Sequence, residues 1–170
     1  MKAIWPSLMW AVMLVPPVAV AQSGDASYFC VEEFAGGLKY NATVNNRVGT
    51  VFTPDHEFLV SLKSAKPRDA ITEAARARAQ VREYAITVTQ SGSNNAVPCL
   101  NLFGQGGDGT VLITVLLAGG QGFCQAEDTD YKFNFAANRF LSVHPFGFVD
   151  GKDKPENTPY ISGGTCTKVN

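Results

Sequence analysis

The segment YKFNF, residues 131–135, alternates aromatic and polar side chains and predicts a β-strand. Successive side chains of a strand point to opposite faces, so the three aromatic residues would share one face. They are Tyr131, Phe133 and Phe135. A second segment, HEFLVSLK at residues 56–63, repeats the pattern less cleanly, because Leu59 adds an apolar group to the polar face. Both segments favour strands with one face in a core.

Short β-prone runs recur along the chain, separated by Gly, Asn, Asp and Pro. They are SYFCVEEF, LKYNATV, RVGTVF, HEFLVSLK, REYAITVTQ, VPCLNLF, TVLITVLLA, YKFNF, RFLSVHPFGFV and PYISGGTCTKV. This spacing predicts an all-β, antiparallel domain, built as a β-barrel or a β-sandwich of about eight strands. The run TVLITVLLA, residues 110–118, is apolar on both faces, so we expect a central strand that is covered on both sides.

One segment departs from the β pattern. Residues 68–80 are rich in alanine, Pro67 stands where a first helical turn tolerates proline, and Asp69 lies near the expected helix N-terminus. We expect a short surface helix over residues 68–80. Its apolar side is mostly alanine and would bury little area.

The first 21 residues have the three parts of a secretory signal peptide. Lys2 supplies the charged start, an apolar run follows, and Ala19-Val20-Ala21 forms a small-residue cleavage site. We expect cleavage after residue 21 and a single β domain over residues 22–170, in the periplasm or outside the cell. No later apolar run has the length of a membrane span, so we expect none in the mature chain.

The chain has four cysteines, which an exported protein most often pairs into two disulfides. Spacing alone allows three pairings. Residues 28–31 and 165–168 look like the first and last strands, and neighbouring end strands would join Cys30 to Cys166. Cys99 would then pair with Cys124. Just before Cys166, Gly163 and Gly164 would allow a bulge or a close approach of another backbone.

Charge and composition argue against several classes of function. Lys and Arg number 14 and Asp and Glu 15, a formal net charge of −1, so the chain lacks the basic excess that nucleic-acid binding needs. The cysteines and the two histidines, His56 and His144, are not closely spaced as in zinc sites, so we expect no metal and no cofactor.

An enzymatic alternative uses Cys166 as a nucleophile with His144 and Asp150, because catalytic groups need only converge in space. Pairing of all four cysteines would consume that thiol. The sequence therefore favours a non-catalytic role, with a hydrolytic or thiol enzyme as an alternative.

Aromatic residues are densest between residues 131 and 148. They would form either a packed core or the lining of a barrel cavity for an apolar ligand. The candidate ligand-binding residues, which include a histidine at a proline-induced bend, are Phe133, Phe135, Phe140, His144, Phe146 and Phe148.

The C-terminal order of YKFNF, NRFL, a strand ending in FVDG and a closing TPYIxxGxC resembles small exported β-rich proteins of proteobacteria, whose function is unknown. More distantly, the early Tyr28-Phe29-Cys30 and a disulfide are similar to the periplasmic inhibitors of C-type lysozyme, which are small β-barrels. These resemblances imply an exported β domain and supply no catalytic residue. We therefore expect a disulfide-stapled domain that binds a small apolar ligand or another protein, or that serves as an envelope structural or assembly component.

Overall fold

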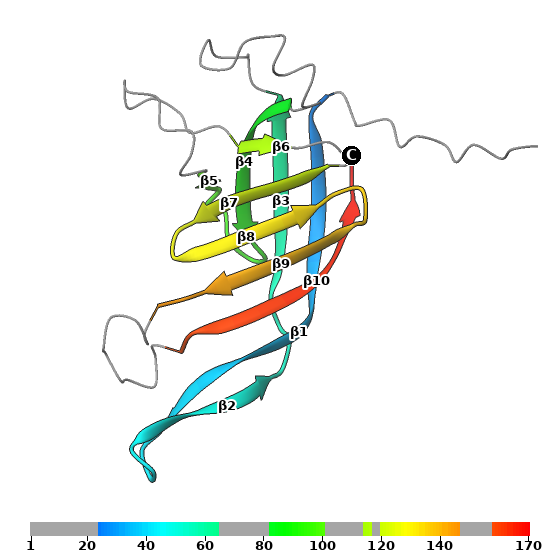
Figure 1. Cartoon of the computed structure of the whole chain (residues 1–170). Helices are drawn as coiled ribbons and strands as arrows, with labels where there is room; N and C mark the ends of the chain where they lie inside the picture. Colours follow the sequence, from blue (N-terminus) through cyan, green and yellow to red (C-terminus); the bar gives the residue numbers. More distant parts are fainter. Residues whose placement is uncertain (1–23, 65–81, 101–113, 117–119, 147–157) are drawn as a thin grey trace, which may run out of the picture.

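The structure is a computed structural model that describes residues 24–64, 82–100, 114–116, 120–146 and 158–170. These residues form ten β-strands and no helix (Figure 1). The strands are β1 (Ala26–Asn41), β2 (Asn46–Phe52), β3 (Glu57–Ser64), β4 (Arg82–Gln90), β5 (Val97–Cys99), β6 (Thr114–Leu116), β7 (Gln121–Ala126), β8 (Thr129–Asn134), β9 (Arg139–His144) and β10 (Tyr160–Lys168). The all-β prediction is confirmed.

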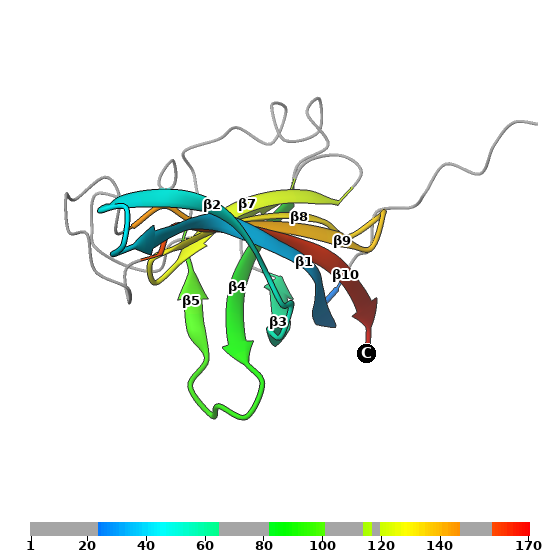
Figure 2. The same ribbon diagram turned by 90° about the horizontal axis from the view of Figure 1, so that it is seen from below.

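All strands belong to one antiparallel sheet with the order β5-β4-β3-β1-β10-β9-β8-β7, in which β2 also pairs with β1 and β6 with β4. The two end strands meet. Leu100, just after β5, exchanges backbone hydrogen bonds of 2.6 and 2.7 Å with Gln125 of β7. The sheet is therefore a nearly closed barrel, and β7–β10 cross β3 and β4 at a steep angle (Figures 1 and 2).

The barrel interior is filled largely by aromatic side chains. The alternation in YKFNF holds, because its three aromatic residues are all buried. Ring contacts with centroid separations of 4.5–5.6 Å, typical of favourable aromatic pairs, join six buried residues: Tyr28, Phe135, Phe133, Tyr131, Phe58 and Phe140. Val60, Leu62, Ile86 and Val88 complete this core from β3 and β4.

Strand β1 changes partner along its length and carries a bulge. Its first part pairs with β3, its second part pairs with β2, and β10 pairs with both parts. Glu32 lies opposite Gly164 and Phe34 opposite Gly163, so Glu33 is the extra residue. One inserted residue exchanges the two faces of a strand, and Phe34 consequently lies outside although Glu32 lies inside.

Several details differ from the sequence predictions or lie beyond the described residues. The run SYFCVEEF and the first four residues of LKYNATV belong to one long strand, β1, and residues 42–44 lie in the turn that follows it. The segment QGFCQA, which the β-prone runs omit, forms β7. Of TVLITVLLA, only residues 114–116 are described, and they pair with β4, off the main strand order rather than at the centre of the sheet. The expected signal peptide and the helix predicted over 68–80 lie outside the described residues.

Candidate binding surface on the β1–β2 hairpin

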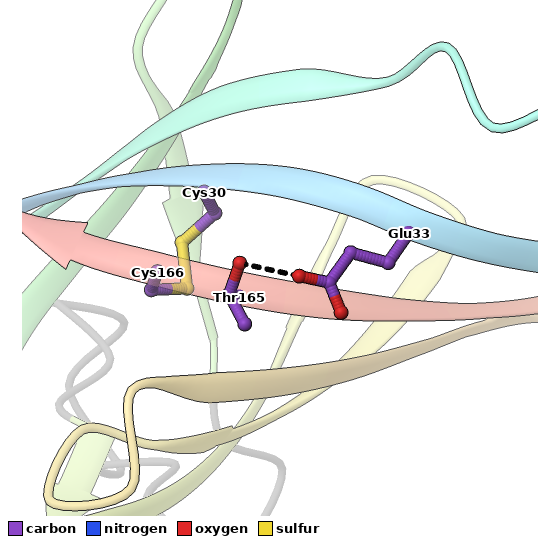
Figure 3. Close-up of a disulfide and its surroundings, with 4 residues drawn as sticks. All are labelled: Cys30, Glu33, Thr165 and Cys166. Atoms are coloured by element: carbon purple, nitrogen blue, oxygen red, sulfur yellow. Dashed lines mark hydrogen bonds between the residues drawn. A yellow bond between two sulfur atoms is a disulfide. The ribbon is translucent and has the colours of Figure 1, made fainter.

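The two disulfides join Cys30 to Cys166 and Cys99 to Cys124, the pairings that the sequence favours. Cys30 and Cys166 lie directly opposite each other on β1 and β10, with 4.0 Å between their Cα atoms. Beside them, the Thr165 hydroxyl donates a hydrogen bond of 2.8 Å to Glu33 Oε1 (Figure 3). No cysteine is left free, so Cys166 links β10 covalently to β1 in this structure.

The structure describes five of the six candidate ligand-binding residues, and these five are divided between the core and the surface. Phe133, Phe135 and Phe140 lie in the core, whereas Phe146 is 41% exposed. His144 lies at the end of β9, with its ring stacked on Tyr160 at a centroid separation of 5.4 Å. Phe148 and Asp150 are outside the described residues. Among the residues that are described, no group of three or more His, Cys, Asp and Glu is arranged to hold a metal ion.

Two tyrosines lie near polar groups of the barrel: Tyr131, which is buried, and Tyr160, which is half-buried. Burial, supported by the nearby Tyr160, raises the pKa of Tyr131 to about 12 although hydrogen bonds with Gln90 and Thr129 lower it. Burial, followed by the charge of Glu32, also raises the pKa of Tyr160. Glu32 is itself buried and accepts a hydrogen bond of 3.2 Å from the Asp55 backbone N–H. Both phenols are therefore neutral at ordinary pH and can act as hydrogen-bonding groups.

A cleft of about 100 Å³ opens beside Tyr131, between the β4–β5 and β7–β8 turns. Its polar lining includes Gln90, Asn95, Glu127 and Thr129. Pockets for drug-sized ligands are usually about 300–1,000 Å³ and mostly apolar. The cleft is smaller and more polar than such a pocket, and none of the candidate phenylalanines lines it.

The outer face of the sheet carries an apolar patch, which we define as Phe34, Leu38, Val51 and Ile161. These residues are 54%, 39%, 87% and 45% exposed, respectively. Gly36 of β1 pairs with Val51 of β2 on one side and with Ile161 of β10 on the other. Phe34 and Leu38 stand two residues before and after Gly36, on the same face. The four side chains thus surround a glycine and form one continuous apolar surface.

The patch lies where the β1–β2 hairpin projects from the barrel, at the lower left of Figure 1. The charged residues of the hairpin are all cations, because the sequence from residue 34 to residue 54 contains Lys39 and Arg47 but no Asp or Glu. The Arg47 side chain crosses β1 and donates a hydrogen bond of 3.1 Å to the Leu38 carbonyl. The hairpin is therefore cationic and apolar, on a chain with a net charge of −1.

The sequence reasoning did not identify this patch. Phe34 ends an alternating run whose earlier members Tyr28, Cys30 and Glu32 are buried, so alternation alone would place it inside. The available signals were the adjacent pair Glu32-Glu33, which breaks alternation, and the two glycine pairs at 36–37 and 163–164.

These features define a class of protein: a disulfide-stapled, antiparallel β-barrel with a projecting cationic and apolar hairpin. No protein-family model matches the chain, no curated protein matches its sequence, and no solved structure matches its fold. Within the described residues, no helix has the length and apolar character to cross a membrane.

Proposed function

We propose that this chain is an exported, non-catalytic domain that binds another protein, in the periplasm or outside the cell. The two disulfides support export, because such bonds form and persist in oxidising compartments. An envelope assembly component would be one form of this role. The resemblance to exported β-rich proteins points the same way.

The apolar patch is the observation that carries the proposal. Contiguous exposed apolar surface on a soluble protein marks a site of interaction with another molecule. Val51 is the most exposed of the large apolar residues described, and it belongs to β2 in the projecting hairpin. Burying the patch in an interface would remove its apolar area from water and so favour binding.

A small apolar ligand in the barrel is less well supported than a protein partner. The aromatic core is packed ring against ring, and the cleft at the barrel end is polar. A thiol enzyme is also less well supported, because Cys166 is bonded to Cys30.

Site-specific photo-crosslinking in the organism that encodes the chain tests the proposal. A photoreactive amino acid replaces Val51 on the patch, and in a matched control it replaces Lys63, which is exposed at the far end of β3. We expect a protein adduct from position 51 and none from position 63. Adding Phe34→Ser and Ile161→Ser should remove that adduct. No adduct at position 51, or equal adducts at both positions, would refute protein binding through this surface.

A further inference from the structure

The cleft beside Tyr131 is separate from the apolar patch, because none of the patch residues lines it. It lies between the β4–β5 and β7–β8 turns and has a volume of about 100 Å³. A cavity of this size has room for a few water-sized groups. It can therefore accept the end of one flexible chain, although it is too small for a drug-sized ligand.

The lining of the cleft combines apolar and polar side chains. Val88, Val97 and Ala126 supply the apolar part. The polar part consists of Gln90, Ser93, Asn95, Glu127, Thr129 and Tyr131. Hydroxyl and amide oxygens each have two lone pairs, so an oxygen that already accepts one hydrogen bond can accept another. The lining therefore suits a ligand with an apolar stem and a head rich in hydrogen-bond donors.

Glu127 is the charged residue of the cleft. Burial and the nearby Tyr160 raise the pKa of Tyr131 most, and the charge of Glu127 raises it further, so this carboxylate lies near the phenol. Among the described residues, no Lys or Arg forms an ion pair with Glu127. The described side chains therefore leave the negative charge beside the cleft without a cation.

The strand ends around the cleft are also acidic. They are neighbours through strand pairs such as Phe58 with Gln90 and Tyr160 with His144. The described segments at these ends are residues 30–32, 53–57, 90–97, 126–131, 144–146 and 158–160. They contain no Lys or Arg and six carboxylates, which are Glu32, Asp55, Glu57, Glu127, Asp128 and Asp130.

The acidic surface extends from the cleft to the start of β10. Thr129, which lines the cleft, forms hydrogen bonds with both Tyr131 and Tyr160. Burial is the main cause of the raised pKa of Tyr160, and the charges of Glu32 and Asp55 add to it, so these carboxylates also lie nearby. Residues 147–157, which join β9 to β10 outside the described part, add three carboxylates and two lysines to the sequence. Their net charge is therefore negative as well.

These properties select a cation with several N–H donors. Anions would be repelled by the carboxylates. In the described part of the chain, no group of three or more His, Cys, Asp and Glu is arranged to hold a metal ion. A guanidinium group pairs best with a carboxylate through two parallel hydrogen bonds, whereas an ammonium group directs three donors to separate acceptors. An ammonium group also carries a methylene stem that can lie along apolar side chains.

We propose that the cleft beside Tyr131 binds a primary alkylammonium group, such as a lysine side chain of another protein or a free diamine carries. The ammonium group lies beside Glu127 and donates hydrogen bonds to oxygens of the polar lining. The alkyl stem lies against Val88 and Val97. This site does not depend on the proposed role of the apolar patch.

The test uses the exported chain, labelled with ¹⁵N, and follows the chemical shifts of the Gln90 and Asn95 side-chain amides. The probe is N-acetyl-lysine methylamide. The matched control is N-acetyl-norleucine methylamide, which has the same alkyl stem without the ammonium group. We expect the lysine probe to bind at least about tenfold more tightly, because hydrogen bonds that involve a charged group are the stronger ones. Equal binding of the two probes, or shift changes only outside the cleft, would refute the inference.

Two charge-matched variants separate the cleft from the general negative charge of the chain. Glu127→Gln keeps the size of the side chain and removes its charge, so it should weaken binding of the lysine probe about fivefold, as expected for an exposed ion pair. Glu33→Gln removes one exposed carboxylate that does not line the cleft, and it should leave binding unchanged. Equal losses in the two variants would show unspecific attraction and overturn the inference.

Cadaverine distinguishes the two sources of the ammonium group. A preference for cadaverine over the lysine probe, corrected for its second ammonium group, would assign the cleft to a free diamine. A preference for the lysine probe would assign it to a side chain of another protein. Either result supports an alkylammonium site. Shift changes at the cleft with calcium chloride and with neither amine would show a metal site instead and would overturn the inference.

Discussion

The ring of Phe34 lies over Gly163 on the outer face of the barrel, where the apolar patch begins. A Cβ atom at Gly163 would stand 2.5 Å from Cζ of Phe34 and 3.0 Å from the Phe140 carbonyl oxygen. The neighbouring Gly164 is closer still to β1, because a Cβ there would collide with the Val31 carbonyl oxygen. The bulge at Glu33 and the ring of Phe34 are thus accommodated by the absence of side chains on β10.

Gly163→Ala should destabilise the barrel by about 1–3 kcal/mol, because the added methyl group must displace the Phe34 ring and the backbone of β9. Gly49→Ala is the matched control, since no atom of the described residues lies within 4 Å of the Cβ that it would add. Urea unfolding of both variants measures the difference. Equal midpoints would mean that the contact between Phe34 and Gly163 is not maintained in solution.

The two disulfides should have different effects on stability. In the chain-entropy model, removal of Cys30–Cys166, which spans 136 residues, costs about 5 kcal/mol, and removal of Cys99–Cys124, which spans 25, costs about 3.5 kcal/mol. Cys30–Cys166 joins strands that are already paired along their length, whereas Cys99–Cys124 joins β5 and β7 beside a single bridge, Leu100 to Gln125.

Replacing Cys99 and Cys124 by alanine should therefore open the barrel locally at this seam. Hydrogen exchange of the Leu100 and Gln125 amides should accelerate more than that of amides in β3. In the variant with Cys30 and Cys166 replaced by alanine, exchange should rise with global unfolding and show no excess at the seam. Uniform acceleration in both variants would contradict this assignment.

The fold class was accessible from sequence because strand formation follows local alternation. The alternation in YKFNF predicts that Tyr131, Phe133 and Phe135 share one face, and all three are buried. The disulfide between Cys30 and Cys166 follows from the adjacency of the first and last strands in the sheet. Closure of the barrel was not accessible in the same way. It depends on the contact of Leu100 with Gln125, and β7 is too short and mixed in composition to stand out.

The binding surface was missed for a different reason. Its residues lie on three strands, of which β10 is far in sequence from the β1–β2 hairpin, and the bulge at Glu33 reverses the expected face of Phe34. The density of aromatic residues instead predicted a ligand site at residues 131–148, and the described part of that segment includes three phenylalanines of the core. A sequence shows how many aromatic residues a segment has, whereas exposure depends on register.

Tyr131 should make stability fall at alkaline pH. Its pKa is raised by burial from 10.0 to about 12, so the unfolded chain loses the phenolic proton first as the pH rises. The contribution is complete below about pH 10 and is lost progressively up to about pH 12, amounting to about 2–3 kcal/mol. Denaturant unfolding between pH 8 and 12 measures this loss. Tyr131→Phe should flatten the profile, and an unchanged alkaline slope in that variant would assign the loss to other groups.

Ser142 of β9 and Ser162 of β10 form a buried pair on the inner face, with 2.7 Å between their hydroxyl oxygens. Replacing either serine by alanine leaves the other hydroxyl without this partner in the core, which costs about 1–3 kcal/mol. Replacing both removes the need for the bond, so Ser142→Ala with Ser162→Ala should be more stable than the sum of the single effects predicts. Urea unfolding of the four proteins forms a double-mutant cycle. Additive losses would show that water or another group satisfies each hydroxyl separately.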